Sequence, residues 1–316
     1  MSTKTGFIPR HGILSSPLRH RCVWGALCAA AMLAAPAAGG TMYVSRFPQT
    51  IDQISPTGVA SLFATLPTNS DPWGMVFDGS GNLYVADAFT NQISKVTPGG
   101  VVSLFATLPT PNGLAIDGSG NLYASNYNSG QISRITSGGV VSLFATLPAG
   151  SGPGDLVFDS SGNLYVADRL TDRVSKITSG GVVSLFATQP AGSAPWGLAF
   201  DSSGNLYVSD EYPITSPSQI RKITPSGAVS LFATLPVGSD TRGLAFDSSG
   251  NLYAADNYTD QISKISPDGL TVSTFSTGNS SPHFIAFGPV PEPSTTLLLA
   301  AAGALALGQR RKPQAS

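Results

Sequence analysis

A repeat of about 40 residues dominates this sequence. The phrase Ser-Leu-Phe-Ala-Thr starts at Ser61, Ser103, Ser142, Ser184 and Ser230, and a modified copy starts at Ser273. A second phrase, Asp-x-Ser-Gly-Asn-Leu-Tyr, starts at Asp78, Asp117, Asp159, Asp201 and Asp247. A period near 40 residues with several short strands in each copy is the signature of β-propeller blades. The repeat therefore predicts an all-β fold.

Each copy of the repeat divides into four strand-like segments. In the second copy these are residues 74–77, 82–86, 92–96 and 101–107, which are rich in β-branched and aromatic residues. Turn-forming residues separate them at positions 78–81 and 97–100. The polar and apolar residues alternate imperfectly, as expected where both faces of a sheet are covered by neighbouring blades. The pattern predicts four strands per blade.

The two ends of the repeat region complete one blade between them. Residues 41–44 match a second strand, and residues 282–287 match a first strand. We therefore expect a six-bladed β-propeller over residues 41–288. Its closing blade would take three strands from residues 41–67 and one from residues 282–287. Such a mixed blade removes the open sheet edge that would invite aggregation.

Residues 1–40 have the pattern of a secretory signal peptide. A segment with four basic and no acidic residues precedes an apolar stretch at 23–35, and small residues at 35–37 suit a cleavage site. The alternative is a transmembrane anchor, but the apolar stretch is short for a span. Cys22 and Cys28 both lie in this segment, so we expect no disulfide and no cysteine metal site after cleavage.

The C-terminal segment, residues 289–316, has the pattern of a second targeting signal. Pro291, Glu292 and Pro293 precede an apolar stretch at 295–307, and Arg310 and Arg311 follow it. This order resembles the PEP-CTERM sorting signal. The resemblance implies export, transient anchoring in the inner membrane through a short transmembrane helix, and processing by an exosortase. It also implies a Gram-negative bacterium that makes exopolysaccharide, with the protein ending at the cell surface or outside the cell. The alternative is an ordinary tail anchor with a proline-rich linker.

The repeat itself resembles NHL-repeat propellers. The resemblance rests on residues 81–87 and 197–201 and on Asn91-Gln92-Ile93. It implies the propeller fold but no single function, because this architecture hosts binders, scaffolds and enzymes. The formal net charge of -1 gives no basic field for nucleic acid.

Variation between copies is concentrated in the loops of one face of the predicted propeller. These loops join one blade to the next, or join second to third strands, and the longest is at residues 211–218. Variation on one face of a repeat protein marks its binding face. The residue before the first-strand glycine should lie at the channel mouth on this face. The candidate ligand-binding residues at this position are Trp73, Asn112, Trp196, Arg242 and His283, with Gly154 as the sixth.

This composition suits stacking on a sugar ring or another flat polar group. The alternative is that these side chains only fill the channel mouth. The carboxylates at the ends of the second strands are expected to accept backbone N–H bonds from the following loop. They are Asp87, Asp168, Asp210 and Asp256. The turn aspartates, such as Asp78, are expected to stabilise their own turns.

Two enzyme families offer weaker resemblances. Residues 111–115, Pro-Asn-Gly-Leu-Ala, resemble the metal-binding asparagine motif of gluconolactonase and regucalcin propellers, which makes Asn112 a weak metal candidate. The acidic ligands that this family adds are replaced here by tryptophan, arginine and glycine, so we expect no metal and no cofactor. Streptogramin-lyase propellers are expected to use a histidine pair, whereas residues 41–288 contain only His283.

The sequence thus favours a non-catalytic propeller that binds exopolysaccharide or a surface protein after export. A divergent gluconolactonase-like or lyase-like enzyme and a protein–protein interaction scaffold stay open as alternatives.

Overall fold

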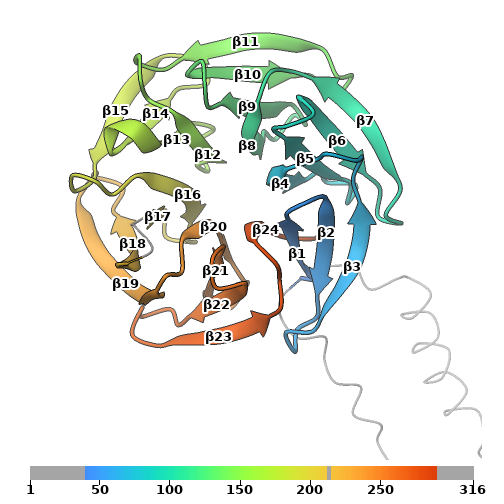
Figure 1. Cartoon of the computed structure of the whole chain (residues 1–316). Helices are drawn as coiled ribbons and strands as arrows, with labels where there is room; N and C mark the ends of the chain where they lie inside the picture. Colours follow the sequence, from blue (N-terminus) through green and yellow to red (C-terminus); the bar gives the residue numbers. More distant parts are fainter. Residues whose placement is uncertain (1–39, 212–214, 290–316) are drawn as a thin grey trace, which may run out of the picture. The chain divides into compact units, whose positions relative to one another are not determined.

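The computed structural model describes residues 40–211 and 215–289. Within them, 24 strands form six four-stranded antiparallel sheets arranged around a central channel (Figure 1). The six-bladed propeller predicted from the repeat is confirmed. The signal peptide, the sorting motif and the apolar stretch at 295–307 lie outside the described residues.

The blades are numbered from the closing blade, and their strands are given from the channel outwards. Blade 1 contains β24 (Pro282–Phe287), β1 (Met42–Arg46), β2 (Thr50–Ile54) and β3 (Ala60–Thr65). Blade 2 contains β4 (Pro72–Phe77), β5 (Leu83–Asp87), β6 (Gln92–Val96) and β7 (Val102–Thr107). Blade 3 contains β8 (Pro111–Ile116), β9 (Leu122–Asn126), β10 (Gln131–Ile135) and β11 (Val141–Thr146).

Blade 4 contains β12 (Pro153–Phe158), β13 (Leu164–Asp168), β14 (Arg173–Ile177) and β15 (Val183–Thr188). Blade 5 contains β16 (Pro195–Phe200), β17 (Leu206–Asp210), β18 (Pro217–Ile223) and β19 (Val229–Val237). Blade 6 contains β20 (Thr241–Phe246), β21 (Leu252–Asp256), β22 (Gln261–Ile265) and β23 (Val272–Thr277). A single 3-10 turn, η1 (Arg169–Thr171), follows β13. No helix in the described part of the chain is long and apolar enough to cross a membrane.

The mixed closing blade forms as predicted. β24 pairs antiparallel with β1, with Val44 opposite Ile285 and Met42 opposite Phe287. Figure 1 shows the two ends of the propeller meeting in this blade, where β24 lies beside β1. The inner strand of blade 1, β24, therefore lies about 240 positions along the chain from β1, its neighbour in the sheet.

The core lies between the blades. In each blade the tyrosine of the second strand packs edge-on against the phenylalanine of the outer strand, as Tyr165 does against Phe186 at 4.8 Å between ring centroids. The same tyrosine also packs against the inner strand of the next blade, as in the contact of Tyr165 with Phe200 at 5.1 Å. This double contact explains why the second strands are buried on both faces and show no polar alternation.

The tight turns are built by their own aspartates, as predicted. Oδ1 of Asp78 accepts the backbone N–H groups of Ser80 and Asn82, both at 2.9 Å, and Oδ2 accepts the Asn82 amide at 2.8 Å. The Tyr84 hydroxyl donates to the same Oδ2 at 3.4 Å. Because the other Asp-x-Ser-Gly-Asn-Leu-Tyr copies repeat this network, this face of the propeller is nearly uniform.

Candidate functional site at the channel mouth

The inner strands approach one another closely at the mouth. A Cβ atom at Gly197 would lie 1.9 Å from the backbone oxygen of Arg242, and one at Gly74 would lie 2.6 Å from that of Asn112. Only glycine allows the backbones to approach so closely. The preceding side chains of neighbouring blades are thereby brought to one place, as the position of these residues in the repeat predicts.

Four of the five candidate residues contact one another. The ring of Trp73 stacks on that of His283, with 4.4 Å between centroids and 21° between planes, and lies 5.1 Å from the ring of Trp196. The Arg242 guanidinium carbon lies 4.9 Å from the centre of the Trp73 ring and 5.7 Å from that of Trp196. The fifth residue, Asn112, is buried at the same level of the fold. Together these five residues are called the mouth cluster.

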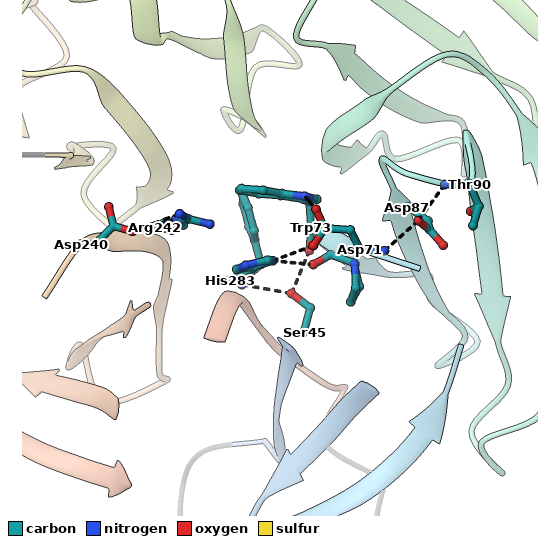
Figure 2. A network of polar contacts seen from close by, with 10 residues as sticks. Ser45, Asp71, Trp73, Asp87, Thr90, Asp240, Arg242 and His283 are labelled. Atoms are coloured by element: carbon teal, nitrogen blue, oxygen red, sulfur yellow. Dashed lines mark hydrogen bonds and ion pairs between the residues drawn. The ribbon is translucent and has the colours of Figure 1, made fainter. Parts of the chain in front are cut away.

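Two aspartates in the loops between blades hold the cluster in place. Asp71 accepts the indole N–H of Trp73 at 2.8 Å and donates its own backbone N–H to Asp87 at 3.0 Å. Asp240 pairs with Arg242 at 3.0 Å. Figure 2 shows both contacts, and also His283, whose Nδ1 faces Oδ1 of Asp71 at 3.7 Å. Burial raises the pKa of Asp71 and of Asp240, while the nearby Arg242 cation lowers both.

His283 is a buried, neutral member of the cluster. Its Nδ1 lies 3.0 Å from the backbone oxygen of Pro72, so this nitrogen carries the hydrogen and Nε2 keeps the lone pair. Burial, reinforced by the Arg242 cation, lowers the pKa of His283 to about 4. The imidazole therefore contributes a flat ring and no charge at neutral pH.

Three more residues, which the sequence analysis did not single out, complete the mouth. The Arg169 guanidinium carbon lies 4.5 Å from the centre of the Trp196 ring. Arg169 also donates from Nε to Glu211 at 2.6 Å and from a terminal nitrogen to the Tyr127 hydroxyl at 2.9 Å. Each of the three is the first residue after a second strand. This position differs between copies of an otherwise constant unit, and that difference is the signal that could have identified them.

Several buried polar atoms of the mouth have no hydrogen-bond partner among the described residues. They are Nε1 of Trp196, Oδ1 of Asn112 and Oδ1 of Asp71. Buried polar groups in proteins are nearly always hydrogen-bonded to protein, water or ligand. One donor and two acceptors in the same region match the hydrogen-bonding capacity of hydroxyl groups or ordered water.

Beyond the mouth cluster, the inner strands surround a cavity of about 410 Å³. Apolar residues of the inner strands line it, and Asp155 is the one charged lining residue. Its carboxylate accepts the backbone N–H groups of Leu156 at 2.8 Å and Leu198 at 3.1 Å. Burial nevertheless raises the pKa of Asp155 to about 7. Asp155 was not predicted as a site residue; it occupies the position that glycine takes in most other blades.

The prediction for the carboxylates at the ends of the second strands is only partly right. Asp87 accepts the backbone N–H of Thr90 at 3.2 Å in the following loop, as expected. Asp168 and Asp256 instead accept hydrogen bonds from serine hydroxyls, Ser175 and Ser263, and Asp210 pairs with Arg221. Each of these partners lies on the third strand, two residues beyond the residue directly opposite the aspartate, and is a diagonal neighbour on the same face of the sheet.

No group of three or more histidine, cysteine, aspartate or glutamate side chains in the described part of the chain is arranged to hold a metal ion. Asn112 presents a single side-chain oxygen, and its counterparts in the mouth cluster are two tryptophans, an arginine and a histidine. A hard cation needs several oxygen ligands.

Comparison with known sequences identifies the family of the propeller. The profile of the virginiamycin B lyase family matches residues 107–292, which is more than half of the chain. The chain belongs to the virginiamycin B lyase family. The lyase-like resemblance is thereby shown, whereas the NHL and gluconolactonase resemblances stay predictions. A second profile, the PEP-CTERM protein-sorting motif, matches residues 289–312 and implies export with exosortase processing in a Gram-negative bacterium.

Solved structures with the same fold include members of the virginiamycin B lyase family. A streptogramin B lyase is 20% identical, with a TM-score of 0.64 over 81% of this chain and 89% of that one. A catalytically inactive histidine-to-alanine variant of virginiamycin B lyase from Staphylococcus aureus, solved with quinupristin, is 18% identical, with a TM-score of 0.61 over 79% and 92%.

A chain of the nidogen/laminin complex is 19% identical, with a TM-score of 0.66 over 78% of this chain and 97% of that one. No curated protein matches the sequence. At these identities the likeness to solved structures concerns the fold alone.

Proposed function

We propose that the exported propeller binds a ring-containing, hydroxyl-rich ligand, such as an exopolysaccharide, at the channel mouth without transforming it. The observation that carries the proposal is the mouth cluster, in which two indoles, an imidazole and a guanidinium lie against one another. Aromatic rings bind the apolar faces of sugar rings, and buried donors and acceptors bind sugar hydroxyls. The orphaned atoms of Trp196 and Asn112 supply the second kind of group.

Export gives this proposal its setting. The sorting motif at residues 289–312 implies exosortase processing. We infer that the protein is held at the inner membrane until that step and then resides at the cell surface or outside the cell. There it would meet exopolysaccharide, or a surface protein if the propeller serves as a scaffold. Either partner would bind at the variable face of the propeller, where the mouth cluster lies.

The test is direct binding of oligosaccharides to the exported protein, measured by calorimetry and on a glycan array. Trp73→Ala and Trp196→Ala should each weaken binding by roughly 10-fold or more, since stacking on an aromatic ring contributes about 1–3 kcal/mol. Tyr258→Ala is the matched control, because Tyr258 is 64% exposed and is not part of the mouth cluster. Unchanged affinity in both tryptophan variants, with their unfolding temperatures close to the wild-type value, would refute the proposal.

Family membership favours a second candidate, a lyase. His283 is neutral, and Nδ1 is occupied by the Pro72 carbonyl, so Nε2 could accept a proton. Its low pKa makes it a weak base at neutral pH, which favours binding over catalysis. Chromatography would show whether the exported protein consumes quinupristin, the compound named with one relative. Consumption that is lost in His283→Ala would establish the lyase and overturn the non-catalytic proposal.

A further inference from the structure

Three side chains from successive blades form a bridge over one side of the mouth cluster. Tyr127 of blade 3, Arg169 of blade 4 and Glu211 of blade 5 each stand 42 residues from the next, one repeat apart. Arg169 is the centre, because it bonds both Tyr127 and Glu211. We call these three residues the rim bridge.

The rim bridge covers a ring that the proposed ligand would use. The Arg169 guanidinium lies over Trp196 at 4.5 Å from the ring centre, and the Trp196 side chain is only 4% exposed. A planar guanidinium on an indole face occupies the place where a sugar ring would stack. A ligand can therefore reach Trp196 only if Arg169 moves aside or itself becomes part of the contact.

The two arginines of the mouth differ in how firmly their carboxylates are held. Arg242, in β20, is paired with Asp240, which immediately precedes that strand and whose side chain is 2% exposed. Arg169 is paired with Glu211, whose side chain is 20% exposed and comes from the next blade. Arg169 is itself 25% exposed. Glu211 is thus the carboxylate that an incoming anion could replace.

The charge of the ligand decides how easily the bridge opens. A neutral ligand that separates Arg169 from Glu211 breaks this ion pair and supplies no new charge partner, although Asp240 also acts electrostatically on Arg169. A ligand carboxylate can instead take the place of Glu211. An arginine fork binds a carboxylate through two parallel N–H···O bonds and can remain stacked on an aromatic ring while doing so. Both the pairing and the stacking on Trp196 would then be kept.

We propose that the mouth selects glycans that carry a carboxylate, with Arg169 as the residue that binds it and Glu211 as an internal competitor for the same guanidinium. This inference rests on the proposed function and specifies its ligand as an acidic polysaccharide segment. The rim bridge would then determine specificity, because it disfavours the binding of neutral sugars and opens when a uronic acid binds Arg169.

The experiment compares tri-galacturonic acid with its methyl ester, in which a methyl group on each carboxyl removes the charge. The exported wild-type protein should bind the acid at least about 10-fold more tightly than the ester, and added salt should reduce the preference. Glu211→Gln should tighten binding of the acid by roughly 5-fold, because the competing charge is gone. Arg169→Gln should abolish the preference for the acid and leave the ester bound as well as before or better, since Trp196 is uncovered.

Asp268→Asn is the matched control for removing one carboxylate, because Asp268 lies in a fully exposed turn of blade 6. It should leave both affinities unchanged. Equal binding of acid and ester by the wild type, or no gain in Glu211→Gln, overturns the inference while the proposed glycan site stands. Failure of the wild type and of both rim-bridge variants to bind either probe overturns the proposed function and the inference together.

Discussion

At the scale of single residues, the structure of the mouth depends on glycines that let the inner strands approach closely. Gly197 allows the inner strand of blade 5 to meet that of blade 6, because a Cβ atom there would overlap the Arg242 backbone oxygen at 1.9 Å. Residues on either side of this contact, Trp196 and Arg242, belong to the mouth cluster. Any shift of the backbone at Gly197 would therefore move the cluster as well.

We predict that Gly197→Ala lowers the free energy of unfolding by about 2–4 kcal/mol, since the neighbour that must move is backbone and cannot rotate away. Urea unfolding followed by tryptophan fluorescence measures the change. Gly118→Ala is the control, because a Cβ atom at Gly118 meets nothing within 4 Å. If both variants unfold at the same urea concentration, the close approach at Gly197 does not limit stability.

At the scale of elements, the first hairpin of blades 2 to 6 is stabilised by its turn aspartate. Asp159 accepts the backbone N–H groups of Ser161 and Asn163 and the side-chain amide of Asn163. Burial raises the pKa of Asp159, but these hydrogen bonds and the Lys176 charge outweigh it, so the pKa is lowered from its usual value of 3.8. Since the folded state binds this proton less tightly than the unfolded chain, the carboxylate stabilises the fold above pH 4.

We predict that Asp159→Ala reduces the free energy of unfolding by about 1–2 kcal/mol at pH 7, through the loss of these hydrogen bonds. The difference from wild type should shrink as the pH falls below 4, because the wild-type carboxylate then becomes protonated. Urea unfolding at pH 7 and pH 3 provides the measurement. Ser160→Ala alters an exposed neighbour in the same turn and should have little effect; a constant difference between the two pH values would contradict the assignment.

At the scale of the whole molecule, one strand closes the ring. β24 supplies the inner strand of blade 1 and pairs with β1 over its length. Its side chains Phe284 and Ile285 are buried in the clusters on either side of the blade. Without β24, the edge of β1 and these two clusters would be exposed to solvent.

We predict that deletion of residues 282–316 abolishes cooperative thermal unfolding and causes aggregation, because the ring cannot close. Deletion of residues 290–316 alone should leave the unfolding temperature within a few degrees of that of the full chain, since all 24 strands of the described propeller are retained. Differential scanning calorimetry distinguishes the two. Cooperative unfolding of the chain lacking residues 282–316 at the same temperature would show that β24 is dispensable.

Much of the fold could be predicted because the same sequence pattern recurs in each blade. The turn residues and the strand residues recur at the same positions of each copy, so a strand that is unclear in one copy can be assigned from the others. The mixed closing blade follows from the unpaired strands at the two ends of the repeat region. The same alignment identified Trp73, Trp196, Arg242 and His283, because equivalent positions of a propeller meet at its axis. The partners of Asp168 and Asp256 were misjudged, since they depend on which side chain lies across the sheet.

The sequence by itself determined the number of blades, the way the ring closes and the address at the C-terminus, because periodicity and a contiguous motif are local properties of a chain. Only the tertiary structure decided how the mouth is closed. Arg169, Tyr127 and Glu211 are one repeat apart, and nothing local to any of them indicates an ion pair or a ring beneath the guanidinium. Their contacts exist because successive blades pack side by side, which brings positions 42 residues apart within hydrogen-bond distance.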